Sequence, residues 1–279
     1  MNASDSMQRL SAAIDQAQSC ACIGIDPVLQ RLPADLRKSP SSGTSTDLDH
    51  LRTFCMGVID AIAPHARVIK PQSACFERYA ANGYAILAEV IQAAKAKDLV
   101  VILDAKRGDI GSSATHYAVG AAAMGADFIT CSPYMGRSSI QPFLNENLGV
   151  FALCKTSNPD ASELQSPETT EAVARMINDM GEQVGAVVGA TNTPEETQAL
   201  RTHMPDSMFL VPGVGAQGGT IEDVRAMTRP IATQHAHLGV VINASRSVLY
   251  PTPQPNETWQ DAIAREAKSF AASCRTLLD

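Results

Sequence analysis

Short apolar runs recur along this 279-residue chain, with helical patterns between most of them. Each run is continuously apolar and does not alternate with polar residues, which is typical of parallel strands that are covered on both faces. We therefore expect eight buried strands, at residues 21–25, 67–69, 99–103, 127–131, 150–154, 184–188, 208–211 and 238–242.

The segments between these runs predict helices that pack on a sheet. Residues 48–62 and 86–94 carry apolar side chains three and four positions apart, which is the stripe of a half-buried helix. A strand followed by a helix, eight times over, indicates an α/β fold with a single (β/α)8 TIM barrel. A doubly wound open sheet is the alternative. Trp259 and Tyr117 fall at helical spacings and are predicted to be packing residues.

One barrel of about 250 residues would hold most of the chain, so we predict one domain over residues 1–279. A helix is expected before the first strand, at about residues 5–20, and another at the end of the chain, near Leu278. Residues 37–46 are rich in Ser, Pro, Thr and Gly, and we interpret them as an exposed insertion.

Polar residues follow the ends of most of the predicted strands. In a barrel all of these ends open on one face, so side chains more than two hundred positions apart meet at one mouth. We expect the substrate to bind there. The residues in question are Asp26, Lys70, Asp104, Lys106, Ser157, Gln217 and Arg246.

The string Asp-Ala-Lys-Arg-Gly-Asp-Ile-Gly, at residues 104–111, is the most informative in the chain. Alternate residues of a strand point to the same side, so Asp104 and Lys106 should project together. Because burying unpaired charges is costly, we interpret the string as an array of charges that compensate one another. A salt bridge that merely closes a loop is the alternative.

A glycine-rich segment at residues 211–219 follows the seventh strand and predicts half of a phosphate site. Arg246, after the eighth strand, can supply forked donors for the other half. The segment also has the glycine spacing of a dinucleotide-binding loop. That loop belongs near the start of a fold and needs an acidic residue about 20 positions later, so a nicotinamide cofactor is disfavoured.

The formal net charge of −7 disfavours nucleic acid or an anionic membrane as a partner. No apolar run reaches the length of a membrane-spanning helix, and the first 20 residues do not resemble a secretion signal. The seven cysteines are odd in number and scattered, which is typical of buried thiols in a reducing cytoplasm. Cys20-x-Cys22 lacks the further ligands of a metal site, so no metal is expected.

Taken together, six strings of this sequence resemble the orotidine 5′-phosphate decarboxylase family, in the longer of its bacterial forms. They run in the family's order and cover nearly everything from residue 22 to residue 249. Ser245 departs from the pattern, because shorter members carry glycine there, and the insertion at 37–46 is extra. The strings are Ile-Asp-Pro at 25–27, Ile-Lys-Pro at 69–71, the charged string at 104–111, Thr-Ser-Asn-Pro at 156–159, the segment 212–219, and Ala-Ser-Arg-Ser at 244–247.

The resemblance implies that orotidine 5′-phosphate is decarboxylated to uridine 5′-phosphate (UMP) and carbon dioxide in pyrimidine biosynthesis, without cofactor or metal. Lys106 would stabilise negative charge at C6 of the pyrimidine and then protonate it. Asp104 and Lys70 would hold Lys106 in place. The resemblance further implies a homodimer in which Asp109 reaches the partner's site.

The substrate-binding residues are likewise implied by the resemblance. Asp26 and Lys70 would reach the ribose hydroxyls, and Ser157 would bind the pyrimidine. Gln217 and Arg246 would hold the phosphate. The remaining members of the implied substrate-binding set are Pro212, Ile110 and Ser113.

Two other functions are weighed against this one. Magnesium-dependent barrel enzymes acting on keto-sugar phosphates share an Asp-x-Lys-x-x-Asp array, but Arg107-Gly108 within the array and Lys70 in place of an acidic ligand argue against them. A nucleotide-sensing barrel without catalytic activity is the second alternative, and the intact Lys106, Asp104 and Asp109 argue against it.

Overall fold

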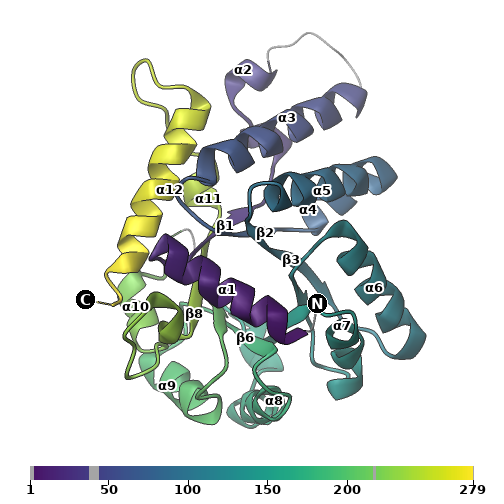
Figure 1. The fold of residues 1–279 in the computed structure, drawn as a ribbon, viewed down its shortest axis with the longest axis vertical. Helices are drawn as coiled ribbons and strands as arrows, with labels where there is room; N and C mark the ends of the chain where they lie inside the picture. The colour runs from purple at the N-terminus through teal and green to yellow at the C-terminus, as the bar shows by residue number, and fades with distance from the viewer. Residues whose placement is uncertain (1–2, 38–43, 216–217, 279) are drawn as a thin grey trace.

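Eight parallel strands form a closed barrel in the computed structural model, which describes residues 3–37, 44–215 and 218–278. Each strand pairs with the next one in sequence, and β8 pairs with β1 to close the barrel (Figure 1). The predicted TIM barrel is confirmed, and the doubly wound sheet is excluded. The strands are β1 Ala21–Ile25, β2 Val68–Pro71, β3 Val100–Arg107, β4 Phe128–Cys131, β5 Gly149–Lys155, β6 Val184–Val188, β7 Phe209–Val211 and β8 Val240–Ala244.

Helices follow the strands and surround the barrel (Figure 1). The α-helices are α1 Ala3–Ala17, α2 Ala34–Arg37, α3 Thr44–Ile62, α4 Ala74–Glu77, α5 Ala80–Lys95, α6 Gly111–Met124, α7 Gln141–Asn145, α8 Pro167–Asp179, α9 Pro194–His203, α10 Ile221–Arg225, α11 Arg246–Leu249 and α12 Trp259–Arg275. Short 3₁₀ turns are η1 Leu29–Arg31, η2 Arg137–Ser139, η3 Pro159–Glu163 and η4 His235–Leu238.

Local sequence explains where several helices begin. In α9, α10 and α12 a threonine hydroxyl accepts a hydrogen bond from the backbone N–H three residues later, and the acidic side chain at that position accepts one from the threonine N–H. This reciprocal cap satisfies two donors that a helix end otherwise leaves unpaired. The pairs are Thr193 with Glu196, Thr220 with Asp223, and Thr258 with Asp261.

Strand β3 extends further than the apolar pattern indicates. The predicted strand ends at Leu103, whereas the observed one continues to Arg107. Parallel pairing continues past the apolar residues, since Gln72 bridges to Asp104 and Arg107 pairs with Cys131. The charged string therefore lies partly within the strand, because backbone hydrogen bonds hold the strand where side-chain hydrophobicity no longer does.

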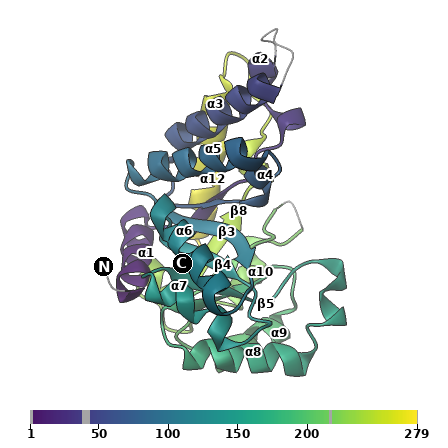
Figure 2. The same ribbon diagram turned by 90° about the vertical axis from the view of Figure 1, so that its right-hand side faces the viewer.

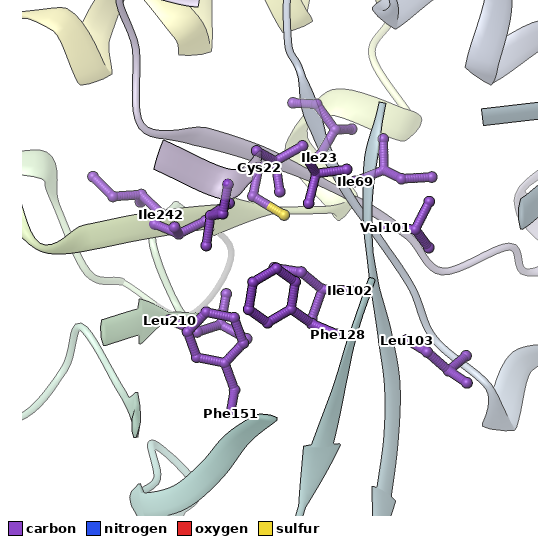
Figure 3. Close-up of a cluster of buried hydrophobic side chains, with 14 of the residues drawn as sticks. Cys22, Ile23, Ile69, Val101, Ile102, Leu103, Phe128, Phe151, Leu210 and Ile242 are labelled. Atoms are coloured by element: carbon purple, nitrogen blue, oxygen red, sulfur yellow. The ribbon is translucent and has the colours of Figure 1, made fainter. Parts of the chain in front are cut away.

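Two aromatic side chains fill the interior of the barrel (Figure 3). The rings of Phe128 and Phe151 lie 5.3 Å apart, centre to centre. Glycines on the next strands make room for them. A Cβ at Gly149 would lie 2.2 Å from the Phe128 ring, and one at Gly185 would lie 2.6 Å from the Phe151 ring. The barrel is thus a packed core with no open pore below its mouth.

Helix α1 lies across one end of the barrel (Figure 1), and Figure 2 shows it from the side. Arg9 of α1 binds Asp127 at 2.8 Å, and the Lys95 ammonium binds both oxygens of the same carboxylate at 2.8 Å. Asp127 is buried just before β4 and also accepts a hydrogen bond from the Val101 N–H. This network closes the amino-terminal end of the barrel and leaves the other end for chemistry.

Three local predictions have different outcomes. Trp259 does pack, with its ring 5.5 Å from that of Phe54. Tyr117 does not pack in the core, because it is 43% exposed on α6, where the Arg107 guanidinium lies over its ring at 4.9 Å from the ring centre. Helical spacing alone did not show that this face of α6 points outward. The predicted insertion at 37–46 falls largely on residues 38–43, outside the described residues.

Candidate active site

The carboxyl ends of the strands enclose a cavity of about 470 Å³. Of the candidate site residues, the structure brings Asp26, Lys70, Asp104, Lys106, Ser157, Pro212 and Arg246 to its wall. These seven come from six different strand ends, as the barrel prediction requires. Gln217 lies outside the described residues.

Asp104 sits at the centre of a buried array of charges. One carboxylate oxygen accepts from the Lys70 ammonium at 2.5 Å, and the other accepts from the Lys106 ammonium at 2.6 Å. The side chains of Lys70 and Asp104 are 6% and 7% exposed, whereas that of Lys106 is 47% exposed. The array is thus anchored at the Lys70–Asp104 pair and opens toward the cavity at Lys106.

The pKa values follow from this arrangement. Burial alone would raise the pKa of Asp104, but the Lys70 and Lys106 cations outweigh it and hold the pKa far below its ordinary value. Burial alone would lower the pKa of Lys70, but the Asp104 and Asp26 carboxylates outweigh it and raise the pKa. Asp104 is therefore ionised and Lys70 protonated at neutral pH.

The backbone of Lys106 is in an unusual conformation. Its φ angle is +46°, in the left-handed region that a lysine rarely adopts. Non-glycine residues held in this region cluster at functional sites, where the surrounding structure enforces the strain. Asp104 and Lys106 do meet, as alternation along a strand predicted, but the strand between them is not regular.

Asp26, at the end of β1, offers an unpaired acceptor at the cavity. Its Oδ1 is buried and has no hydrogen-bond partner among the described residues. Its backbone carbonyl is fixed by the Tyr250 hydroxyl at 3.1 Å, which in turn accepts from the Val28 N–H at 2.7 Å. A buried oxygen without a partner is costly, and a ligand hydroxyl is a suitable donor for it.

The segment after β5 forms another wall. Ser157 and its neighbours Thr156 and Asn158 all line the cavity. The Gln165 side chain holds this segment, because it accepts from the Thr156 N–H and donates to the Thr156 hydroxyl, both at 2.8 Å. A residue eight positions beyond Ser157, which itself lines the cavity, therefore holds this wall in place.

The far wall is made by the ends of β7 and β8. Pro212, Gly213 and Val214, which follow β7, line it together with Arg246, the first residue of α11 after β8. The exposed guanidinium of Arg246 has no carboxylate partner within the described part of the chain. It is the cation on this wall, and a phosphate oxygen would supply the charge that it lacks.

Asp109, Ile110 and Ser113 do not line the cavity of this single chain. Asp109 is half-buried, and its Oδ1 accepts from the Ile110 N–H at 2.8 Å. Ile110 is 55% exposed, and Ser113 lies exposed in the first turn of α6. The three residues therefore form a rim beside the site, on the side of α6.

Residues 44–262 match the model of the orotidine 5′-phosphate decarboxylase / HUMPS family. The chain belongs to this family. Among its relatives, the orotidine 5′-phosphate decarboxylase of Rhodopirellula baltica is 39% identical, with 91% of this chain and 94% of the relative covered. The enzyme of the same name from Halorubrum lacusprofundi is 41% identical, with 95% of each chain covered. The solved structure of Leishmania donovani OMP decarboxylase superposes with a TM-score of 0.73 at 30% identity and 99% coverage of both chains.

The family match contains most of the candidate site but not all of it. Lys70, Asp104, Lys106 and Ser157 fall inside the matched residues, whereas Asp26 precedes them. The relatives named above align over more than nine-tenths of the chain.

Sequence reasoning missed four polar side chains on the cavity wall: Gln72, Thr130, Gln165 and Asn243. Gln72 donates to the Asp104 carboxylate at 3.2 Å, and Asn243 donates to the Ser245 hydroxyl at 3.3 Å. Gln72 directly follows β2, and Asn243 is the last residue but one of β8, so the rule that polar residues gather near strand ends could have found both. Thr130 lies inside the apolar β4 run, and no pattern marked it.

Two features are absent from the described residues. No helix among them is both long and apolar enough to cross a bilayer. Within residues 3–37, 44–215 and 218–278, no three or more His, Cys, Asp or Glu side chains are grouped so as to hold a metal ion.

Proposed function

We propose that this protein converts orotidine 5′-phosphate to UMP and carbon dioxide. The observation that carries the proposal is the Lys70–Asp104–Lys106 array, set at the mouth of a barrel that belongs to this family. The array places the Lys106 ammonium at the cavity, and the buried Lys70–Asp104 ion pair holds it there.

The reaction asks the site to stabilise a carbanion. When the bond between C6 of the pyrimidine and the carboxylate breaks, its electron pair remains on C6 and carbon dioxide leaves. The Lys106 ammonium, half exposed to the cavity, would stabilise that charge and then transfer a proton to C6, leaving a neutral amine. A preorganised cation contributes most where charge develops away from water.

Lys70 and Asp104 would keep Lys106 in place during this step. Asp104 holds both ammonium groups through separate oxygens, so the three side chains alternate in charge. A lysine fixed in this way needs little reorganisation when the charge at C6 appears.

The rest of the substrate fits the remaining walls. Asp26 Oδ1 and Lys70 would bind the ribose hydroxyls, and Ser157 would bind the pyrimidine. Arg246 and the backbone at Pro212 would face the phosphate, together with Gln217. Binding energy from a phosphate remote from C6 can be used to close the site and lower the barrier.

We further propose a two-fold dimer that brings Asp109 into the partner's site. The support is a set of exposed large apolar side chains on α5, on α6, directly before α6 and directly after β4, that is, on or beside elements that contact one another near Asp109. Exposed apolar side chains that gather on one surface mark interaction sites. Ile110 and Ser113 would enter the partner's site with Asp109. The side chains are Tyr84, Ile110, Tyr117, Tyr134 and Met135, which are 39%, 55%, 43%, 85% and 51% exposed.

A cytoplasmic location and the absence of nucleic-acid or membrane partners complete the proposal. All seven cysteines are free thiols, and six of them are buried. Burial raises the pKa of Cys22 to about 12 and that of Cys75 to about 11, so both stay protonated and unreactive. The net charge of −7 favours a small anion held in a local basic pocket over a polyanion.

The deciding experiment follows the orotate chromophore when the protein meets orotidine 5′-phosphate in excess chelator. Lys106→Ala should lower the rate by about 1,000-fold or more, since both the stabilising cation and the proton donor are lost. Lys97→Ala is the matched control, because Lys97 lies before β3 at the opposite end of the barrel and pairs with Asp60 at the surface.

Three outcomes would contradict the proposal. Full activity in a folded Lys106→Ala variant would remove Lys106 from the mechanism. Activity that returns only with magnesium would indicate an enzyme of keto-sugar phosphates. A wild-type protein that binds UMP without any turnover would be a nucleotide-binding barrel.

A further inference from the structure

Thr130 lies where the β3–β4 pairing is irregular. Leu103 pairs with Ile129, and the next pair is Arg107 with Cys131. Asp104, Ala105 and Lys106 thus stand opposite the single residue Thr130. An excess of residues on one strand is a bulge, and bulges beside active sites redirect side chains.

The Thr130 hydroxyl replaces the hydrogen bonds that the bulge interrupts. It accepts from the Lys106 backbone N–H at 2.9 Å and donates to Asp104 Oδ1, also at 2.9 Å. The direction of both bonds is fixed, because an amide N–H can only donate and an ionised carboxylate can only accept. Thr130 is 1% exposed, so water does not compete for either bond.

These two hydrogen bonds connect the strained backbone of Lys106 to the Asp104 carboxylate, which holds the Lys106 side chain. Asp104 Oδ1 accepts from both the Thr130 hydroxyl and the Lys106 ammonium. One hydroxyl therefore links the φ angle of +46° at Lys106 to the carboxylate that orients its Nζ. Strain of this kind persists only where neighbouring groups enforce it.

We propose that Thr130 is a positioning residue, whose hydroxyl sets the bulge that directs Lys106 into the cavity. This inference rests on the proposed function, since its effect is measured as turnover. It assigns Thr130 no contact with the reacting atoms. Its contribution should appear in kcat, because its hydroxyl proton is donated to Asp104 and its oxygen accepts from the Lys106 N–H, so the hydroxyl serves the array and not the substrate.

Three variants separate the hydroxyl from the methyl group. Thr130→Val keeps the shape and removes the hydroxyl, Thr130→Ser keeps the hydroxyl and removes the methyl, and Thr130→Ala removes both. A displacement of about 1 Å in a reacting group can cost about 100-fold in rate. We expect kcat to fall by about that factor in Thr130→Val and Thr130→Ala, with KM within about 3-fold of wild type. Thr130→Ser should stay within about 3-fold in both constants.

Steady-state kinetics on folded variants test whether the Thr130 hydroxyl positions Lys106. Wild-type kcat in either variant without the hydroxyl would overturn the proposal. A rise confined to KM would assign Thr130 to substrate binding instead, and an equal loss in Thr130→Ser would assign the effect to methyl packing. Should Thr130→Val not fold, the comparison of Thr130→Ser with Thr130→Ala gives the same answer.

A crystal structure of the variant tests the inference independently of turnover. In Thr130→Val or Thr130→Ala, Lys106 should leave the left-handed region and its Nζ should move away from Asp104. Retention of both features would overturn the role given to Thr130, whatever the reaction. A wild-type protein without decarboxylase activity would instead contradict the proposed function and leave this structural comparison to decide the role of Thr130.

Discussion

Removing Lys70 should destabilise the protein strongly, and removing Asp104 as well should restore part of the loss. The pair is shielded, with side chains 6% and 7% exposed, so solvent screens little of the interaction. Lys70→Met keeps most of the side-chain volume but leaves a buried carboxylate with one cation fewer. Breaking a buried pair from one side costs about 3–5 kcal/mol.

The double variant Lys70→Met/Asp104→Asn removes the two charges of this pair together, so neither is left buried without the other. We expect its loss of unfolding free energy to be smaller than the sum of the losses in the two single variants, by about 2 kcal/mol or more. Its activity should nevertheless stay as low as that of the worse single variant, because Lys106 has lost its support. Stability would be partly restored while catalysis would not.

Urea unfolding followed by circular dichroism measures the four free energies. Lys97→Met serves as the control, because Lys97 and Asp60 form a lysine–aspartate pair of the same kind, at 2.8 Å, whose side chains are 40% and 68% exposed. Exposed pairs contribute about 1 kcal/mol or less. A folded Lys70→Met variant as stable as wild type, or strictly additive losses in the double variant, would refute the reasoning from burial.

Three further predictions concern the partner subunit, the phosphate and pH. Mixing inactive Lys106→Ala and Asp109→Ala proteins should restore about a quarter of wild-type activity, because about half of the dimers are mixed and each mixed dimer has one intact site out of two. No recovery despite proven subunit exchange would place Asp109 in its own subunit's site. Arg246→Ala should lower kcat/KM by about 10- to 150-fold, which is the equivalent of one charge-assisted hydrogen bond. It should also weaken the binding of UMP but not that of uridine, and an unchanged ratio of these two affinities would contradict a phosphate-binding role for Arg246. The pKa of Asp104 is lowered on folding, so its ionised form stabilises the protein above the ordinary value of 3.8, and this contribution is lost as pH falls toward the lowered value. The difference in unfolding free energy between wild type and Asp104→Asn should thus be constant from about pH 5 to about pH 9 and should shrink in stronger acid. A difference that grows in acid would contradict a lowered pKa of Asp104.

The apolar runs were sufficient to predict the barrel, because a parallel strand covered on both faces must be apolar along its whole length. The barrel prediction also placed Asp26, Lys70, Ser157 and Arg246 at one mouth, because the carboxyl ends of all barrel strands meet there, irrespective of the loop conformations. The roles of these residues stay predictions.

Other parts of the site depend on contacts that a linear pattern does not contain. Thr130 lies within an apolar strand and acquires its position only through the irregular register with β3. Gln165 reaches the cavity from a turn after η3, where nothing in its neighbours marks it. Asp109 and Ile110 are not among the residues that line the cavity of one chain, and the role proposed for them in a partner's site stays a prediction.

The left-handed conformation of Lys106 also affects how this protein would respond to laboratory selection. A residue with a Cβ loses about 1–2 kcal/mol in that region, whereas glycine adopts it without this penalty. A screen for thermal resistance alone would favour Lys106→Gly wherever relief of the strain outweighs the lost contact with Asp104, and that variant would lack the proposed chemistry. Engineering a hardier variant of this barrel therefore requires that turnover be selected together with heat tolerance, because at this position the two demands oppose each other.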